Sequence, residues 1–294
     1  MTPTSRNKPP SRKKNTGTNQ HKSTDGHKPR KRFGQNFLHD PRVIQSILST
    51  INAQKNDHIV EIGPGLGALT GGLLTDCGKL DVIELDQDLV PHLENRFGHS
   101  PLFQIHSADA LKFDFSAMET PEEMSNDRLI RIVGNLPYNI STPLIFHLLS
   151  QSHVIQDMHF MLQKEVVDRL CAGAGESAYG RLGIMVQYHC ETERVISVGP
   201  GAFNPPPKVD SAVIRLTPHK QKPVSTQNVE LLSKVVTAAF NQRRKTIRNG
   251  LKNLADSTLL EAAGIDPSER AENIALKQFA NLADLLHTNY NIQP

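Results

Sequence analysis

Four consecutive residues, Asn135-Leu136-Pro137-Tyr138, carry the most specific chemistry in the sequence. The N6 amine of an adenine is a weak nucleophile because its lone pair is delocalised into the ring. The Asn135 side-chain oxygen and the Leu136 backbone carbonyl can accept its two hydrogens and direct the lone pair outward. Pro137 restricts the backbone that carries this carbonyl, and Tyr138 can stack on an extruded base. The motif predicts group transfer by positioning and electrostatics, without a dedicated general base; a proline-stabilised turn is the alternative.

A glycine-rich motif, Glu61-Ile62-Gly63-Pro64-Gly65-Leu66-Gly67, follows a short apolar run. Glycines in such a turn let a ligand approach the backbone closely, because no Cβ atom blocks it. Glu84 comes 21 residues after Gly63, where a carboxylate can accept both hydroxyls of a ribose. Gly63, Gly65 and Ala68 also satisfy the dinucleotide fingerprint. This motif alone therefore leaves open a nicotinamide enzyme, a nucleoside-cofactor enzyme and a turn with no ligand.

Two further acids favour a cationic cofactor. Glu61 directly precedes the glycine turn, where its charge would repel a pyrophosphate and attract a cation. Asp109 follows a later apolar run and can accept a hydrogen from an adenine amine. Each acid alone could be a helix cap or a loop carboxylate. Together with Glu84 they lie at successive predicted strand ends, which favours S-adenosylmethionine, a ligand with a sulfonium, an ammonium and no phosphate.

Short apolar runs and helix-length segments alternate in the part of the chain that carries these motifs. The apolar runs predict strands at 58–62, 80–85, 102–106, 129–133, 158–162, 195–198 and 212–216. Helix-length segments lie at 68–75, 87–97 and 140–149. This alternation is typical of an α/β protein with a doubly wound parallel sheet.

The pattern changes after residue 218, where no further strand is predicted. One helix, straight or kinked, is predicted over 229–254, and helical segments follow around 259–263 and 271–288. We therefore divide the chain into a disordered basic arm (1–30), a catalytic domain (31–218) and a small all-helical domain (219–294).

The net charge of +3, from 33 Lys and Arg against 30 Asp and Glu, conceals a strong asymmetry. Residues 1–32 carry ten basic residues and one acid, residues 33–218 carry 13 and 22, and residues 219–294 carry ten and seven. An acidic body with basic ends suggests a polyanionic partner. No apolar run approaches the roughly 20 residues of a membrane span, so we expect no membrane association.

The Cys and His residues give no sign of a metal site. The cysteines, Cys77, Cys171 and Cys190, are far apart, and the 13 histidines show no metal-ligand spacing. Unpaired cysteines are typical of a reducing compartment. We therefore expect a cytoplasmic protein without a metal.

A basic cluster in the C-terminal region is the best candidate for contacts with RNA. It consists of Arg243, Arg244, Lys245, Arg248 and Lys252, with no acid among residues 241–252. At helical spacing Arg244, Arg248 and Lys252 would share one face. Such a face is either solvated or positions RNA through its phosphates. Weaker candidates near the predicted cleft are Arg181, Lys208 and Arg215.

Several motifs, taken in order along the chain, closely resemble the bacterial small-subunit rRNA adenine N6,N6-dimethyltransferases. They are 31–38 (KRFGQNFL), 61–67, 82–86 (VIELD), 134–143 (GNLPYNISTP), 161–166 (MLQKEV), 179–182 (YGRL), 203–211 (FNPPPKVDS) and 239–248 (AFNQRRKTIR). The resemblance runs from about residue 30 to the C-terminus, and the basic arm lies outside it.

The resemblance implies a class I methyltransferase fold, Rossmann-like, with a seven-stranded sheet whose last strand is antiparallel, and a small helical domain that faces RNA. It implies dimethylation of two adjacent adenosines near the 3′ end of 16S rRNA, with S-adenosylmethionine as donor. The partner would be 16S rRNA in the small ribosomal subunit or its precursor. We expect the enzyme to be a monomer.

The resemblance also implies roles for individual residues. Contacts with S-adenosylmethionine are expected from Asn36, Leu38, Gly63, Glu84, Asp109 and Asn135. Residues 135–138 would hold the target amine, and residues 34–38 would fold over the methionine end of the cofactor. Phe203 would be the second stacking partner of the adenine, although a Phe beside three prolines, taken alone, suggests a loop anchor.

Three other functions are compatible with parts of the sequence. A 23S rRNA adenine methyltransferase shares the Asn-Leu/Ile-Pro-Tyr/Phe motif, but 203–211 and 239–248 favour the small-subunit enzyme. A second alternative is an assembly factor that binds ribosomal RNA as a checkpoint and for which catalysis is a secondary activity. A nicotinamide dehydrogenase is disfavoured by Glu61 and by residues 135–138.

Overall fold

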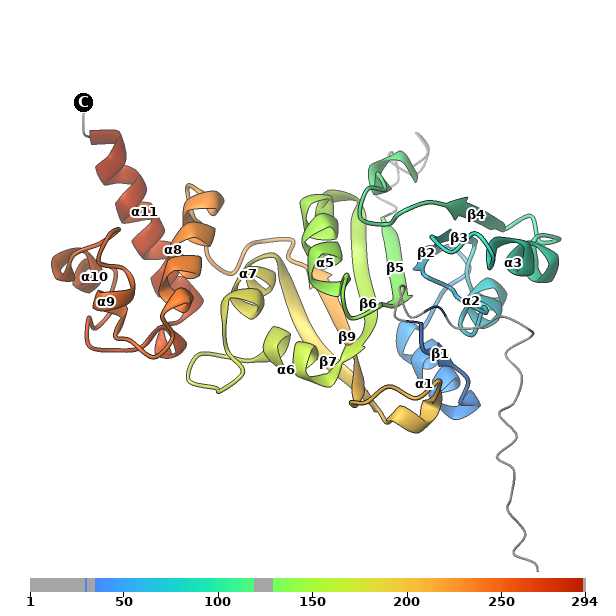
Figure 1. Cartoon of the computed structure of the whole chain (residues 1–294). Helices are drawn as coiled ribbons and strands as arrows, with labels where there is room; N and C mark the ends of the chain where they lie inside the picture. The colour runs from blue at the N-terminus through green and yellow to red at the C-terminus, as the bar shows by residue number, and fades with distance from the viewer. Residues whose placement is uncertain (1–29, 31–34, 119–128, 293–294) are drawn as a thin grey trace, which may run out of the picture.

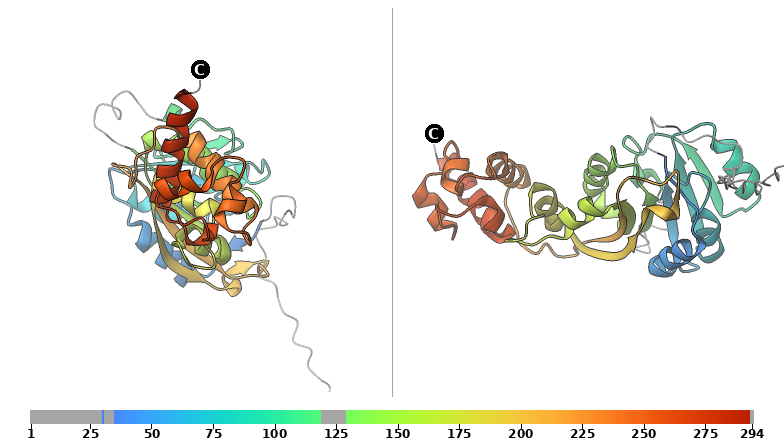
Figure 2. Two further views of the ribbon diagram at one scale, coloured as in Figure 1. Left: turned by 90° about the vertical axis from the view of Figure 1, so that its left-hand side faces the viewer. Right: turned by 60° about the horizontal axis from the view of Figure 1, so that its bottom comes forward.

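The computed structural model describes residues 30, 35–118 and 129–292 of the chain. This part is elongated: a twisted sheet with helices lies at one end and a group of helices, orange to red, at the other (Figure 1). The right-hand view of Figure 2 shows the same arrangement, and the left-hand view looks at the molecule from the helical end. The arm predicted over 1–30 lies outside the described residues except for Arg30, and so does Gly34 of the motif expected over the cofactor.

One sheet of seven strands, in the order β4-β3-β2-β5-β6-β9-β7, forms the centre of the catalytic part. The strands are β2 (His58–Ile62), β3 (Lys79–Glu84), β4 (Phe103–Ser107), β5 (Ile130–Asn135), β6 (Ile155–Gln163), β7 (Cys190–Val198) and β9 (Ser211–Pro218). The five neighbouring strands β4, β3, β2, β5 and β6 are parallel, whereas β9 is antiparallel to both β6 and β7. The predicted strands and the antiparallel last strand are confirmed.

Helices cover the two faces of the sheet with separate apolar cores. They are α1 (Pro41–Ile51), α2 (Thr70–Asp76), α3 (Val90–Phe97), α5 (Ser141–Ser150), α6 (Lys164–Cys171) and α7 (Arg181–His189). On one face, Ile51 of α1 and Leu73 of α2 share a core with Leu80 of β3. On the other face, Leu148 of α5 and Val167 of α6 belong to the second core.

Three of these helices were predicted and three were not. The segments expected at 68–75, 87–97 and 140–149 correspond to α2, α3 and α5. Helix α1 has a recognisable start, because the Asp40 side chain accepts hydrogen bonds from the N–H groups of Arg42 and Val43 and Pro41 occupies the first turn. Helices α6 and α7 have no comparable side-chain cap.

The C-terminal part is helical, as predicted, but its first helix is shorter than expected. The helices are α8 (Val229–Asn241), α9 (Ile247–Gly250), α10 (Ser257–Ala262) and α11 (Leu276–Ile292). The continuous helix predicted over 229–254 is wrong, since α8 ends at Asn241. The chain turns there to bury Ile247, whose N–H donates to Glu269 O at 2.6 Å, and Leu251 in the core of this part.

Helix α7 belongs to both halves of the molecule. Its Val186 lies in a core of the catalytic part. Its Ile184, Met185 and Tyr188 lie instead in the core that α8 and α11 form with the other C-terminal helices. The helical part is therefore packed directly against the catalytic part through one shared helix.

Candidate functional site

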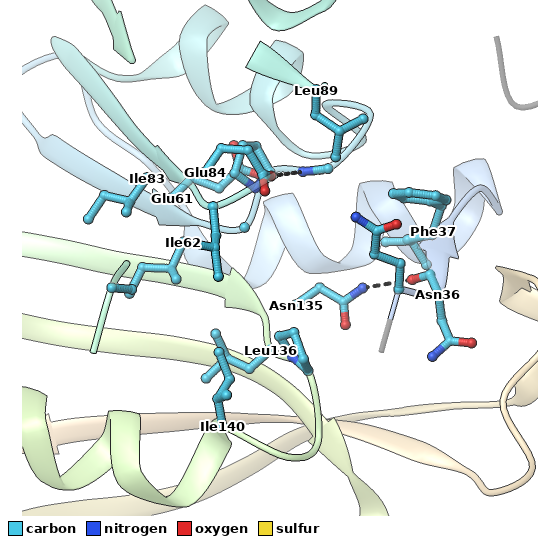
Figure 3. A pocket seen from close by; sticks show the side chains of 18 of the residues that line it. Asn36, Phe37, Glu61, Ile62, Ile83, Glu84, Leu89, Asn135, Leu136 and Ile140 are labelled. Atoms are coloured by element: carbon cyan, nitrogen blue, oxygen red, sulfur yellow. Dashed lines mark hydrogen bonds between the residues drawn. The ribbon is translucent and has the colours of Figure 1, made fainter. Parts of the chain in front are cut away.

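A cavity of about 350 Å³ opens at the carboxyl ends of β2, β3 and β5 (Figure 3). Every residue proposed from the sequence for the cofactor or for catalysis lines it: Asn36, Leu38, Gly63, Glu84, Asp109, Asn135, Leu136, Pro137, Tyr138 and Phe203. Parallel strands end at the same edge of a sheet, so motifs far apart in the chain meet here. Figure 3 shows Glu61 and Glu84 on one wall and Asn36 and Asn135 across from them.

The glycine turn between β2 and α2 requires glycine for two different reasons. Gly63, Gly65 and Gly67 all have positive φ, at 66°, 60° and 77°, a region that other residues rarely adopt. A Cβ atom on Gly67 would lie 2.6 Å from the Phe97 ring, whereas a Cβ on Gly63 would meet nothing within 4 Å. Gly67 is therefore needed for packing, and Gly63 leaves its backbone open toward the cavity.

Glu84, the last residue of β3, is held by backbone donors. Its side chain accepts hydrogen bonds from Asp86 N at 2.8 Å and from Gly65 N at 3.2 Å. Glu84 is 6% exposed, and burial raises the pKa of its carboxyl group. A carboxylate has about four acceptor positions, so both oxygens can still accept hydroxyl groups of a ligand.

Glu61, near the end of β2, is a second buried acid in this wall. Thr70 donates its hydroxyl to Glu61 Oε2 at 2.6 Å. Burial, with the charge of Glu84 adding to it, raises the pKa of Glu61 to about 7. A positive charge in the cavity would favour the ionised form of this carboxyl group. Two buried acids beside an open glycine backbone therefore fit a nucleoside with a cationic tail better than a pyrophosphate.

Asp109 follows β4 and lines the cavity. Its side chain also stabilises the loop that contains it, which is the alternative role considered for this acid. One of its carboxylate oxygens accepts the Leu111 N–H at 3.0 Å. Its backbone carbonyl accepts the Lys112 N–H at 2.9 Å. These bonds fix the turn after β4 and hold the Asp109 carboxylate in place where the residue lines the cavity.

Asn135 ends β5, and its amide orientation is determined by its partner. Its Nδ2 donates to the backbone carbonyl of Asn36 at 3.2 Å. Because a carbonyl only accepts, Nδ2 is the atom on that side and Oδ1 lies on the other. A Cβ on the preceding Gly134 would lie 2.8 Å from Ile62 O, so glycine permits the close approach of β5 and β2.

The rest of the motif is anchored on both sides. Leu136 is buried, and its N–H donates to Met161 O at 3.2 Å. The Tyr138 hydroxyl lies 3.3 Å from the hydroxyl of Ser211, the first residue of β9. The loop 135–138 is therefore held against the neighbouring strand and against the end of the Pro-rich segment.

Phe203 has the position of a loop anchor and also lines the cavity. It lies in β8 (Phe203–Asn204), which forms a separate two-stranded antiparallel sheet with β1 (Phe37–Leu38), where Leu38 faces Phe203. Its side chain belongs to the apolar core on the α1 face, as a loop anchor would, and it also lines the cavity.

The structure does not assemble the basic cluster as predicted. Arg244, Arg248 and Lys252 cannot form a stripe on one helix, because α8 ends at Asn241 and α9 covers only Ile247–Gly250. They and Lys245 are exposed.

Two of the basic candidates are held by contacts within the protein. Arg243 forms an ion pair with Glu272 at 3.0 Å and donates to Ser177 O at 2.5 Å. Arg215 pairs with Glu193 at 2.9 Å and donates to His159 and to Thr50 O. Arg181 and Lys208 are exposed.

Sequence reasoning missed Leu89 and Ile140, which line the cavity with apolar surface, and it gave Phe37 and Gln35 no individual role within the segment 34–38. Phe37 also lines the cavity with apolar surface. Gln35 donates to Asp86 Oδ2 at 2.9 Å, beside Glu84. Gln35, Phe37 and Asp86 lie within recognised motifs, but no spacing rule connects positions so far apart in the chain.

Within the described ranges, no helix is long and apolar enough to cross a membrane. The same residues hold no group of three or more His, Cys, Asp or Glu side chains that could bind a metal ion.

Comparisons with known proteins place the chain among ribosomal RNA methyltransferases. The family model for ribosomal RNA adenine dimethylase matches residues 26–288. The ribosomal RNA small subunit methyltransferase A of Pseudomonas putida is 58% identical over 260 residues, which are 88% of this chain and 96% of that protein.

Two solved structures are similar over most of the chain. A dimethyladenosine transferase from Plasmodium falciparum has a TM-score of 0.72 at 26% identity, covering 86% of this chain and 98% of that one. The 23S rRNA methyltransferase ErmE has a TM-score of 0.67 at 24% identity, covering 86% and 100%, a likeness of fold alone. The sheet order and these neighbours identify the catalytic part as a class I methyltransferase fold.

Proposed function

The chain belongs to the ribosomal RNA adenine dimethylase family, and from this membership we propose which reaction it catalyses. It transfers methyl groups from S-adenosylmethionine to N6 of two adjacent adenosines near the 3′ end of 16S rRNA. The products are N6,N6-dimethyladenosines, formed during small-subunit biogenesis. The observation that carries this proposal is the meeting of Asn135–Tyr138 with the glycine turn and its buried acids in one cavity.

The cofactor side of the cavity suits S-adenosylmethionine, which when bound supplies a methyl carbon on a positively charged sulfur. Glu84, held by two backbone N–H groups, accepts the ribose hydroxyls. Asp109 accepts a hydrogen from the adenine amine, and Gly63 allows the ligand to approach the backbone. Asn36 and Leu38 close the opposite wall, and the charge of Glu61 favours the cationic end.

The acceptor side is built to orient a weak nucleophile. Asn135 Oδ1 and the Leu136 carbonyl accept the two N6 hydrogens of the target adenine, and this directs the nitrogen lone pair toward the cofactor side. Pro137 restricts the backbone of the loop. Tyr138 and Phe203 stack on the base, which must leave its helix to enter the cavity. Catalysis then comes from positioning and fixed dipoles, with no dedicated base.

RNA contacts fall to the helical part, for which we propose the range 219–294, while 31–218 forms the catalytic domain. The exposed cations Arg244, Lys245, Arg248 and Lys252 bind phosphates and position the RNA without reading its sequence. Arg243, paired with Glu272, orients this segment and contributes less to RNA binding. The protein acts in the cytoplasm as a monomer on 16S rRNA in the small subunit or its precursor.

Mass spectrometry of 16S rRNA tests the proposal most directly. Cells that lack the protein should lose the paired dimethyladenosines, and expression of the wild-type chain should restore them. Persistence of both modified bases in the deletion strain would contradict the assignment. Titration with S-adenosylmethionine and with NAD is the second measurement, because binding of NAD instead would favour a dehydrogenase.

A further inference from the structure

A set of polar contacts joins the N-terminal segment to the turn that follows β3. Arg30 Nη1 forms an ion pair with Asp86 Oδ1 at 2.9 Å, and Nη2 contacts the Asp88 carboxylate. Gln35 reinforces the connection, because its Nε2 donates to Asp86 Oδ2 at 2.9 Å and its Oε1 accepts the Arg30 N–H at 2.7 Å. Both ends of the Asp86 carboxylate are thus bound by residues that precede β1.

This turn is the one that holds Glu84. The Asp86 N–H donates to Glu84 Oε1 at 2.8 Å, and the Asp86 carbonyl accepts the Leu89 N–H at 2.9 Å. Leu89 itself lines the cavity. Any movement of Asp86 would therefore displace the carboxylate proposed to bind the ribose.

The segment also reaches the acceptor side of the cavity. Immediately after Gln35, the carbonyl of Asn36 accepts the Asn135 amide at 3.2 Å. A Cβ on Gly65 would lie 3.1 Å from the Phe37 ring, so Phe37 lies directly on the glycine turn. Residues 35–38 accordingly span the cavity from the β3 turn to the loop 135–138, and Arg30 ties down the end nearer to β3.

Charge gives Arg30 a second effect on the site. The Asp86 side chain is 1% exposed, and its charge raises the pKa of Glu84 in addition to the effect of burial. A guanidinium beside Asp86 offsets that repulsion and favours the ionised Glu84, the form that accepts two hydroxyls. Exposed ion pairs contribute little, but this one has a buried partner and is shared by two carboxylates, which strengthens it.

We propose that Arg30 is a positioning residue for the cofactor: its bridge to Asp86 and Asp88 holds residues 35–38 across the cavity and thereby increases the affinity for S-adenosylmethionine. This inference rests on the proposed function, which supplies the identity of the cofactor. It assigns to the junction with the basic arm a role in cofactor binding.

Isothermal titration of the full-length protein with S-adenosylmethionine and S-adenosylhomocysteine tests the inference. Arg30→Ala should raise Kd by about tenfold, equivalent to about 1.4 kcal/mol. Arg30→Lys, which keeps the charge but loses the planar fork, should give an intermediate value. In steady-state assays the KM for the cofactor should rise by the same factor, while kcat and the KM for RNA stay within about threefold, as expected for lost uniform binding.

Reversing the charge of Arg30 tests the bridge further. Arg30→Asp places a carboxylate beside Asp86 and should weaken binding more than Arg30→Ala; adding Asp88→Arg should recover part of that additional loss. The matched control is Arg42→Ala, since that side chain is 95% exposed and lies 3.9 Å from its nearest acid, Asp40. It should bind like the wild type.

The outcomes distinguish this inference from its premise. Equal Kd values for the wild type and Arg30→Ala would overturn the inference while leaving the proposed function intact. So would a double variant no better than Arg30→Asp, or an equal loss in Arg42→Ala. A wild-type protein that binds NAD and no S-adenosylmethionine would instead overturn the proposed function.

Discussion

The cofactor cavity and the basic surface of the helical part are built in opposite ways. In the cavity, Glu84 is 6% exposed and two backbone N–H groups fix its carboxylate. On the surface, Arg244 and Arg248 are exposed and follow the end of α8. The first region holds its charges in fixed positions, whereas the second presents exposed charges on the surface.

This difference predicts two kinds of mutational effect. A fixed polar group in a partly closed site acts at the moment of reaction without reorganising, so its removal is costly. An exposed cation that contacts a phosphate contributes a small amount to the free energy of RNA binding, and this contribution decreases as the salt concentration rises. Four experiments test this contrast, in order of decreasing expected effect, and a fifth measures how Glu61 affects stability.

The largest effect is expected at Asn135. Asn135→Ala removes the oxygen that accepts an N6 hydrogen and should lower kcat by about 10²–10³-fold in methyl-transfer assays. The Kd for S-adenosylmethionine, measured by titration, should change far less. Asn135→Asp keeps an accepting oxygen but loses the amide that donates to Asn36 O, so its activity should lie between those of the wild type and the Ala variant. A wild-type kcat in the Ala variant would show that Asn135 does not orient the target amine.

Glu84 should affect binding of the cofactor more than binding of the subunit. Glu84→Ala removes a charged acceptor for two hydroxyls and should raise the Kd for S-adenosylmethionine by about 50-fold. Co-sedimentation with small subunits should stay within about twofold of the wild type, since the site faces the cofactor. If the variant lost both cofactor affinity and subunit binding, the cavity and the basic surface would not act separately, contrary to the comparison above. Full methylation by the variant would contradict the role of Glu84 in binding the cofactor.

The pH dependence of cofactor affinity should report Glu61. Its pKa is raised to about 7, and a cationic ligand binds the ionised form better, so affinity should fall as the pH falls through 7. Between pH 8 and pH 6 the expected loss is about tenfold, the ratio of the ionised fractions. Titration at the two pH values measures it, and Glu61→Gln should abolish the dependence.

Stability of the protein without cofactor should show the opposite trend. Because the folded pKa of Glu61 lies above its ordinary value of 4.5, ionisation favours the unfolded chain. The contribution of this group to stability is present below pH 4.5 and is lost as the pH rises toward 7. Denaturant unfolding of the wild type and Glu61→Gln across this range separates it from other titrating groups.

The smallest effects are expected on the basic surface. Replacement of Arg244, Arg248 or Lys252 by Ala should each weaken RNA binding by about threefold and lower the salt slope of binding by about one. Filter binding with a 16S rRNA fragment at several salt concentrations measures both. Arg243→Ala is the matched comparison, since its pairing with Glu272 predicts a smaller change in slope. A thousandfold loss from any single cation would overturn the contrast.

The strands and the cavity could be predicted because they follow from local patterns. Short apolar runs identified all seven strands of the sheet, and residues just after parallel strands must meet at one edge. Helix α7 gave no amphipathic signal, because residues such as Ile184 and Val186 face two different cores. The break after Asn241 depends on burial of Ile247 by distant residues, which propensity does not encode.

Arg30 shows why the remainder of the site could not be predicted. Its partners Asp86 and Asp88 lie more than 50 residues away in the chain. No periodicity connects a cation before β1 with acids after β3, so only the folded chain brings them together.

The sharing of α7 between two cores has a consequence for how the molecule unfolds. Removal of the C-terminal helices would leave Ile184, Met185 and Tyr188 facing water on a helix that the sheet still needs. We therefore expect the catalytic part and the helical part to unfold together, because opening either core removes apolar contacts of α7. Selection for stability of the helical part is, through this helix, also selection for a stable catalytic sheet.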